Sequence, residues 1–305
     1  MDNFDDILYN APAEGQNGQL SKEDYAAKKK AERDDVFELS DTTALDVAGD
    51  GNRFQQYLDV QAQFSRYSAV NTLLILAQKP EATRLGDFEH YKGLGGFVKP
   101  GQSAISILEP HEYTKEDGTL GTGYNIKKVF DISQVNARKM KATPAPSYDN
   151  RQLLKALVNK VPMKIIGVDK LPDHLPNDML GENGAATDPK TGDVYVIKGM
   201  EFSDIFSAVA LELAYAEAVN DVSGANDQRF TAYCASYILC KKYGVDTQNF
   251  IFEDAPGTFE MVPDITPQII KQELSKIRDA ADNIAGRMAK HLEAVQKTVK
   301  NPDAR

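Results

Sequence analysis

The sequence predicts an α+β fold made of two successive domains and a long C-terminal helix. Residues 54–78 place apolar side chains at helical spacing, and residues 95–135 then alternate in short stretches typical of strands. Residues 141–150, KATPAPSYDN, contain two prolines and mark a linker between the domains. Residues 267–297 carry one apolar stripe along their whole length, which is typical of a single helix.

Residues 1–50 predict an acidic N-terminal segment that is partly disordered. Residues 1–20 are polar and show no hydrophobic period, so we expect a disordered tail there. Residues 21–48 are highly charged with a helical pattern, and the lysine run at 28–30 is followed closely by acidic residues. A solvated helix face explains this run better than a binding patch does.

Residues 51–140 predict a compact α+β domain. A helix over residues 54–78 is followed by a short helix over residues 85–94. Residues 95–110, GGFVKPGQSAISILEP, predict a β-hairpin, because Pro100-Gly101 suits the centre of a type II turn. The stretch YNIKKVFDISQV then predicts a further strand.

Residues 141–265 predict the second domain, and residues 266–305 predict the long helix. The stretches MKIIGVD and DPKTGDVYVIKG predict strands, and helices are expected over residues 202–220 and 228–245. The final helix is expected to pack on the body of the protein rather than on a second chain. Its apolar stripe comprises Ile270, Leu274, Ile277, Ala281, Ile284, Met288, His291 and Val295.

Composition excludes several classes of protein. The chain is 42% hydrophobic and 26% charged and has no apolar run of membrane-spanning length, so we expect no membrane association. The acidic N-terminus lacks a secretory signal pattern, which indicates the cytoplasm. The net charge of −10 argues against nucleic-acid binding over the whole surface. Residues 53–140, however, hold eleven Lys and Arg against nine Asp and Glu, so any such surface is expected there. Cys234 and Cys240 have a spacing that suits neither a disulfide framework nor a metal site.

The heptapeptide LELAYAE, residues 211–217, has the spacing of a zinc-peptidase helix without its ligands. An HExxH helix places two histidines four residues apart, and the glutamate beside the first one activates the metal-bound water. Leu211 and Tyr215 occupy the two histidine positions here, and Glu212 stands at the general-base position. None of the four histidines in the chain is spaced to bind a metal with another. On spacing alone, an amphipathic core helix explains this segment well.

The N-terminal domain resembles that of the ArdC antirestriction family. The resemblance is carried by RYS-x-x-N-x-LLILAQ-x-P-x-AT, by a G-x-x-VKPG stretch followed by I-x-IL-x-P, and by VFDISQ. These motifs occur in this order over residues 55–140. The LtrC-like branch of the family, found on conjugative elements of Gram-positive bacteria, is the more similar one. The resemblance implies that this domain binds single-stranded DNA.

The resemblance continues into the second domain, which is similar to a zincin metallopeptidase. The family carries HELAHAE on one helix and a glutamate ligand on the next. LELAYAE aligns with HELAHAE, so Leu211, Tyr215 and, on the next helix, Tyr233 stand at the three ligand positions. Glu212 remains as a vestige of the catalytic glutamate. The resemblance therefore implies a non-catalytic pseudo-metallopeptidase domain, in which we expect no metal and no other cofactor.

Single-strand binding requires cations for the phosphates and aromatic faces for the bases. Lys127 and Lys128 are adjacent on a strand, so at most one of them lines a given groove. Tyr67 and Phe97 also fit the apolar pattern of a core, and Arg66 fits an ordinary surface charge. The candidate residues for single-stranded DNA are Arg66, Tyr67, Arg84, Tyr91, Lys92, Phe97, Lys99 and Lys127.

The sequence thus predicts a single-stranded DNA-binding protein of a bacterial mobile or conjugative element. It would protect or handle transferred DNA, as the antirestriction resemblance implies, with conjugation or restriction-system proteins as further partners. Two alternatives are kept: an active metal-dependent peptidase with a non-standard site, and a protein-interaction scaffold of a conjugation complex. Stoichiometric zinc would favour the first alternative, and absence of affinity for single-stranded DNA would favour the second.

Overall fold

The computed structural model describes residues 21–115, 117–138, 140, 146–175, 184–219 and 228–300. The expected disordered tail, residues 1–20, and residues 141–145 of the expected linker lie outside this part of the chain. Among the described helices, none is long and apolar enough to cross a membrane.

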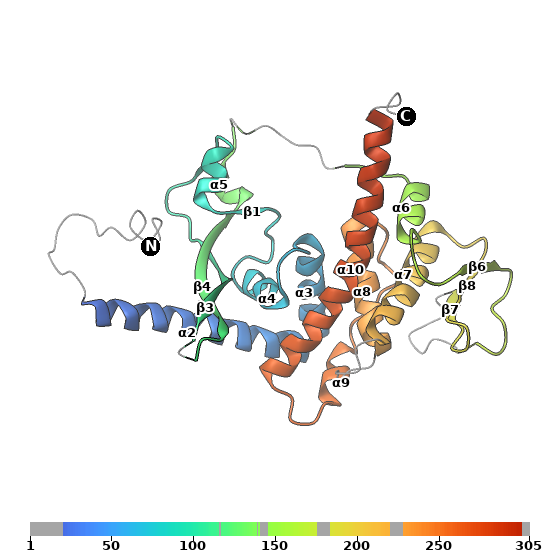
Figure 1. Ribbon diagram of the computed structural model, residues 1–305, viewed down its shortest axis with the longest axis horizontal. Coiled ribbons are helices and arrows are strands. Elements are labelled where there is room, and N and C mark those ends of the chain that lie inside the picture. Colours follow the sequence, from blue (N-terminus) through green and yellow to red (C-terminus); the bar gives the residue numbers. More distant parts are fainter. Residues whose placement is uncertain are drawn as a thin grey trace.

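Helices and short strands follow one another along the chain (Figure 1). The helices are α2 (Lys22–Gly49), α3 (Gly51–Gln63), α4 (Ala69–Gln78), α5 (Phe88–Gly93), the 3-10 helix η1 (Ile132–Gln134), α6 (Asn150–Leu157), α7 (Phe202–Val219), α8 (Gln228–Tyr243), α9 (Ala255–Glu260) and α10 (Pro267–Lys300). The strands are β1 (Leu85–Gly86), β2 (Phe97–Val98), β3 (Ile105–Thr114), β4 (Leu120–Asp131), β5 (Val135–Asn136), β6 (Ile165–Val168), β7 (Ala185–Thr187) and β8 (Val194–Ile197). This mixture of helix and sheet, closed by a long helix, confirms the predicted α+β fold.

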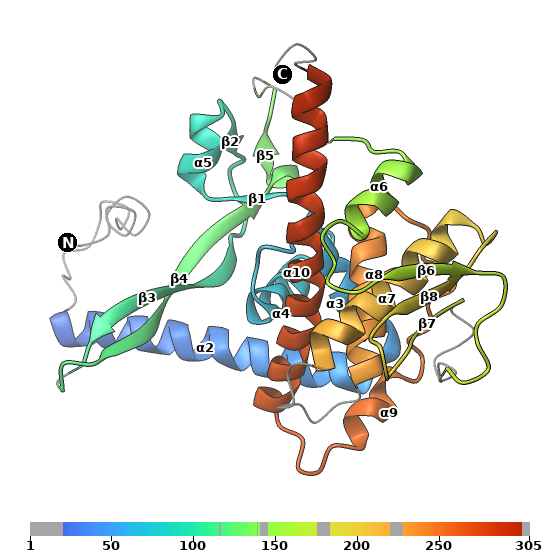
Figure 2. The same cartoon turned by 45° about the vertical axis from the view of Figure 1, so that its right-hand side comes forward.

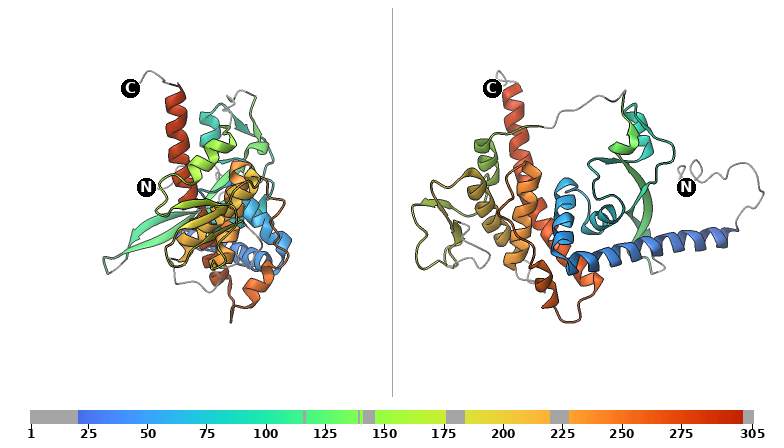
Figure 3. Two further views of the ribbon diagram at one scale, coloured as in Figure 1. Left: turned by 90° about the vertical axis from the view of Figure 1, so that its right-hand side faces the viewer. Right: turned by 180° about the vertical axis from the view of Figure 1, so that it is seen from behind.

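The first three helices begin where the sequence supplies a capping side chain. The side chains of Ser21, Asp50 and Ser68 each accept a backbone N–H from the first turn of α2, α3 and α4. Such bonds satisfy N–H groups that no helical carbonyl reaches. Helix α4 buries most of its side chains and α3 buries about half of its own, and the two helices lie side by side above α2 (Figures 1 and 3). Helix α4 packs directly against β3, and Asn71 of α4 exchanges two hydrogen bonds with the backbone of Leu108.

The expected hairpin over residues 95–110 is wrong. Strand β2 pairs with β5, which places Phe97 opposite Asn136, whereas β3 pairs along its whole length with β4. The turn itself exists, because Gly101 has a φ of 74° that glycine adopts without strain. It leads the chain from one sheet to another instead of folding it back on itself. The partner of β2 lies beyond β4 in sequence, and no local signal reveals it.

Strands β3 and β4 form a long arm that leaves the body and crosses α2 (Figures 1 and 2). On one face the Tyr113 ring covers Gly121, so that a Cβ at this glycine would lie 2.7 Å from the ring. On the other face Tyr124 meets Phe37 of α2 edge to face, with ring centroids 6.0 Å apart. Tyr124 therefore packs the arm against α2, whereas Tyr113 covers the opposite face of the arm.

The second unit places a three-stranded sheet beside α7 and α8. Strand β8 pairs in parallel with β6 and antiparallel with β7. Helix α10 stands between the first sheet and this unit, as Figure 2 shows. Ile270, Ile277 and Met288 of its stripe are fully buried, which confirms the expected internal packing. Leu292, rather than the half-buried His291, continues the stripe.

One hydrophobic core joins the two units. Phe54 of α3 contacts Phe230 of α8 with ring centroids 5.5 Å apart. Its ring also lies 5.8 Å from that of Phe252 and 5.7 Å from that of Phe259. A single buried cluster accordingly contains residues of helices from α2 to α10. The regions that the sequence predicts as separate domains share their interior.

Candidate nucleic-acid interface and the Glu212 cluster

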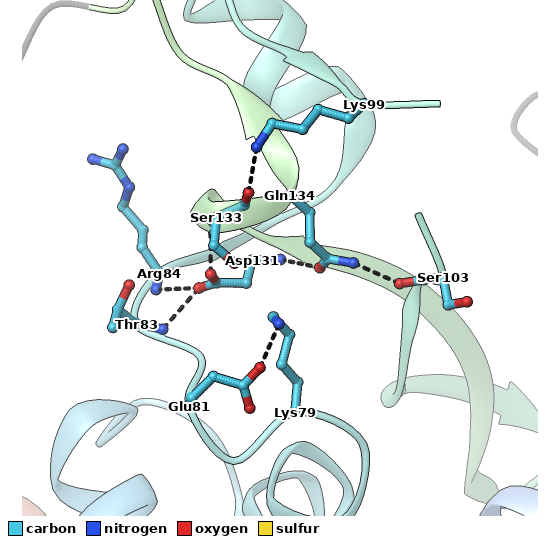
Figure 4. Close-up of polar contacts among 9 residues, drawn as sticks. All are labelled: Lys79, Glu81, Thr83, Arg84, Lys99, Ser103, Asp131, Ser133 and Gln134. Carbon is cyan, nitrogen blue, oxygen red and sulfur yellow. Dashed lines mark hydrogen bonds and ion pairs between the residues drawn. The ribbon is translucent and has the colours of Figure 1, made fainter. Parts of the chain in front are cut away.

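A buried carboxylate, that of Asp131, fixes the loops at one end of the first sheet (Figure 4). It accepts the backbone N–H groups of Thr83 at 2.7 Å, Arg84 at 2.9 Å and Ser133 at 2.8 Å. Burial alone would raise the pKa of Asp131, but these hydrogen bonds outweigh burial and hold that pKa at about 2. The carboxylate thereby joins the segment before β1 to the turn that follows β4.

Four exposed cations and one exposed ring lie on the segments around the Asp131 carboxylate. We call these five side chains the basic cap. The basic cap comprises Arg84, Lys92, Phe97, Lys99 and Arg138. Figure 4 shows the Arg84 side chain extending away from the Asp131 carboxylate. Lys99 donates its Nζ to the Ser133 carbonyl at 2.8 Å.

Phe97 supplies the aromatic ring of the basic cap. Its side chain is 55% exposed although it sits on β2, where the backbone is held by pairing with β5. Lys92 forms an ion pair with Glu89 at 3.6 Å, but both side chains are more than half exposed, so this pair is weak. The structure thus brings Arg84, Lys92, Phe97 and Lys99 of the predicted residues into one region and adds Arg138. An exposed phenyl face together with exposed cations suits a ligand with flat rings and negative charges.

Tyr91 does not belong to an exposed interface, contrary to the sequence prediction. Its ring is fully buried, and its hydroxyl donates to the carbonyls of Arg84 at 2.7 Å and Phe130 at 3.2 Å. Burial raises the pKa of Tyr91 to about 12. The ring offers no face to a base. Its hydroxyl instead connects α5 to the backbone beside Asp131.

Three further candidates lie outside the basic cap. Tyr67 is half-buried against Phe64, and burial raises its pKa. The Nζ of Lys127 pairs with Glu109 at 3.0 Å and with Asp87 at 3.4 Å, so two carboxylates offset its charge. Arg66 is exposed near Lys242 of α8, whose pKa is lowered by burial and also by the Arg66 charge.

Glu212 is buried where α7, α8 and β7 meet, and its side chain is 1% exposed. One carboxylate oxygen accepts Arg229 Nη1 at 2.6 Å, and the other accepts the hydroxyl of Thr187. The Arg229 guanidinium also lies over the Tyr215 ring, 4.0 Å from its centroid. We call these four residues the Glu212 cluster. The carboxylate is paired with a cation, which itself is stacked on an aromatic face.

These side chains do not fit a metal ion. A guanidinium has no lone pair to donate, and its charge repels a metal cation. Leu211 is buried in the core and offers no donor atom. In the part of the chain that the structure describes, no group of three or more His, Cys, Asp or Glu side chains is arranged to hold a metal.

The α8 side chain that bonds Glu212 is Arg229, one helical turn before Tyr233. The sequence prediction placed Tyr233 at this ligand position. Its ring is packed against those of Phe250 and Phe252, with centroids 5.0 Å and 5.4 Å away. Sequence reasoning missed Arg229, although a glutamate on a predicted core helix requires a cationic partner.

Residues 47–145 match the family model described as the N-terminal domain of anti-restriction factor ArdC. An uncharacterized protein of Bacillus anthracis is 26% identical over 278 residues, which cover 74% of this chain and 47% of the relative. The chain therefore spans about half the length of this curated relative.

Two crystal structures of the antirestriction ArdC protein from the R388 plasmid are also similar. The metal-free structure aligns with a TM-score of 0.47 and 15% identity, over 73% of this chain and 86% of the other. The Mn(II)-bound structure aligns with a TM-score of 0.48 and 14% identity, over 73% of this chain and 85% of the other.

Proposed function

We propose that this chain is an antirestriction-type protein of a mobile element that binds single-stranded DNA on its basic cap. The match of residues 47–145 to the N-terminal domain of anti-restriction factor ArdC supports the antirestriction part of this proposal. The exposed Phe97 ring among four cations supports the DNA-binding part. Protection or handling of a transferred strand during conjugation is the process in which we expect it to act.

The exposure of the Phe97 ring is the observation that carries this proposal. Lys99 lies two residues further along the chain, so both side chains are expected on the same side of the extended segment. A base stacked on an aromatic ring contributes about 1–3 kcal/mol and needs a face that is not already stacked in a duplex. The surrounding cations would contact phosphates and make binding dependent on salt. This combination favours a single strand over a duplex.

The second unit takes no catalytic part in this proposal. Its Glu212 carboxylate is 1% exposed and pairs with Arg229 and Thr187, so it is shielded from the water molecule that a catalytic glutamate activates. We propose that this unit has a zincin-like, non-catalytic role. It would support the DNA-binding surface and contact conjugation or restriction-system proteins.

The test is fluorescence anisotropy of a labelled single-stranded oligonucleotide over a salt series, with duplex DNA as competitor. Phe97→Ala is compared with Leu120→Ala, which removes another exposed apolar side chain, on the β3–β4 arm. Lys99→Ala is compared with Lys115→Ala, which removes an exposed lysine at the tip of that arm. We expect the two basic-cap variants to lose affinity about tenfold, and the two arm variants to bind like the unmodified protein.

Equal losses in cap and arm variants would show that binding is not confined to the basic cap. An unmodified chain that shows no anisotropy change even at low salt would overturn the DNA-binding proposal. That outcome would favour the protein-interaction scaffold instead.

A further inference from the structure

The Glu212 cluster contains a buried negative charge, and the source of the positive charge that balances it is informative. A carboxylate that is 1% exposed is strongly destabilised unless a cation stands beside it. In a zinc-peptidase helix of the HExxH type, a bound metal ion supplies positive charge near this glutamate. In this chain the adjacent positive charge comes from Arg229, at 2.6 Å from the carboxylate.

The position of the guanidinium is as informative as its charge. Tyr215 stands three residues after Glu212, where the second histidine of an HExxH helix would face its metal. The Arg229 guanidinium lies 4.0 Å from the centroid of this very ring. It therefore contacts both the residue at the general-base position and the residue at the second ligand position.

We infer that Arg229 is a built-in replacement for a metal ion. Its guanidinium occupies the space in front of α7 that a metal ion would need, and it supplies the positive charge that Glu212 requires. Because an arginine is part of the chain, this charge cannot be removed by a chelator or lost by dilution. The inference concerns the second unit alone and does not depend on the proposed DNA binding.

Thr187 completes the arrangement from β7. Its hydroxyl donates to the carboxylate oxygen that Arg229 Nη1 does not bond. The cluster thus links β7, α7 and α8 through one carboxylate, much as a structural metal links the elements that carry its ligands.

The first experiment measures the coupling between the two charges by thermal unfolding. We expect Arg229→Gln and Glu212→Gln each to lower Tm by about 10 °C, because each removes one half of the Glu212–Arg229 ion pair. The double variant Glu212→Gln/Arg229→Gln is expected to melt at a higher temperature than either single variant. Additive losses in the double variant would contradict a charge-pairing role for Arg229.

The second experiment asks whether removal of the guanidinium makes room for a metal. Leu211→His, Tyr215→His and Arg229→Glu together supply two imidazoles and a carboxylate. We expect this triple variant to bind about one Zn²⁺ per chain, measured by elemental analysis after dialysis, and to gain Tm on addition of zinc. The matched control, Leu211→His/Tyr215→His, keeps Arg229 and is expected to bind no stoichiometric zinc.

Two results would overturn the inference. One is stoichiometric zinc in the unmodified chain, purified without a polyhistidine tag. The other is equal zinc binding by the double-histidine and triple variants, because Arg229 would then not compete with a metal. If the triple variant does not fold, as judged by circular dichroism, the first experiment still tests the charge pairing, and the zinc content of the unmodified chain tests the replacement of a metal.

Discussion

The basic cap and the Glu212 cluster both gather charged side chains, but they differ in what neutralises the charge. In the Glu212 cluster a carboxylate and a guanidinium are withdrawn from water and bonded to each other. In the basic cap the cations are exposed to water, and an exposed phenyl ring stands among them. A buried charge must be paired within the protein, whereas an exposed one remains hydrated until a ligand arrives. The first arrangement stabilises a fold, and the second is suited to binding an external anion.

The largest effect is expected when the buried pair of Glu212 and Arg229 is broken. Glu212→Leu leaves Arg229 in a largely buried position without its carboxylate, and we expect the free energy of unfolding to fall by about 3–5 kcal/mol. The measurement is urea denaturation followed by circular dichroism. Glu201→Leu, at an exposed glutamate just before the same helix, is the control and should stay within about 0.5 kcal/mol of the unmodified protein. A small loss for Glu212→Leu would mean that the cluster does not behave as a buried pair.

The second prediction concerns Asp131, a buried charge beneath the exposed ones. Its pKa is about 2 in the folded protein against 3.8 for an ordinary aspartate, which corresponds to about 2 kcal/mol of stability. Because the folded pKa is the lower one, this contribution is fully present above about pH 4 and is lost as the pH falls toward 2.

Asp131→Asn tests this dependence. We expect it to lower the free energy of unfolding by about 2 kcal/mol at pH 7. Its difference from the unmodified protein should shrink between about pH 4 and pH 2. A difference that stays constant over this range would assign the loss to altered packing rather than to the ionised carboxylate.

The third prediction asks whether Tyr91 stabilises the fold beneath the basic cap or contacts DNA itself. Tyr91→Phe removes a buried hydroxyl that bonds the carbonyls of Arg84 and Phe130. We expect a loss of about 1 kcal/mol in stability and little change in affinity for single-stranded DNA. The two quantities are measured by urea denaturation and anisotropy. Loss of DNA binding with unchanged stability would show that Tyr91 contacts DNA, as the sequence predicted.

The smallest effect is expected at a cation that is already paired. Lys127→Ala removes an ammonium held by Glu109 and Asp87, so the salt dependence of DNA binding should not change. Lys99→Ala should reduce the slope of log affinity against log salt by about 1, because one phosphate contact is lost. Similar slopes for the two variants would show that internal pairing does not decide which lysines bind DNA.

Local patterns predicted the parts of the fold that depend on neighbouring residues. The α10 stripe was predicted from spacing alone, and Ile270, Leu274 and Ile284 are fully buried as expected. The pairing of β2 was not predictable in this way, because Phe97 pairs with Asn136 from a segment that follows two other strands. Burial of the Tyr91 ring also depends on distant carbonyl groups.

The site was predictable in its chemistry and less so in its geometry. Arg84, Lys92, Phe97 and Lys99 were singled out as cations and rings, and the structure places them on neighbouring segments. Their role in DNA binding stays a prediction. Arg229 was missed because its partner, Glu212, lies on another helix and the sequence between them does not fix how the two helices face each other.

The shared aromatic core has a practical consequence for how this protein can be divided. The family match ends at residue 145, yet Phe54 within it is covered by rings from residues 230 to 259. A fragment cut at residue 145 would expose the buried face of α3 to water and should aggregate or melt early. The intact described body should instead unfold in one cooperative transition, in which neither half survives the loss of the other.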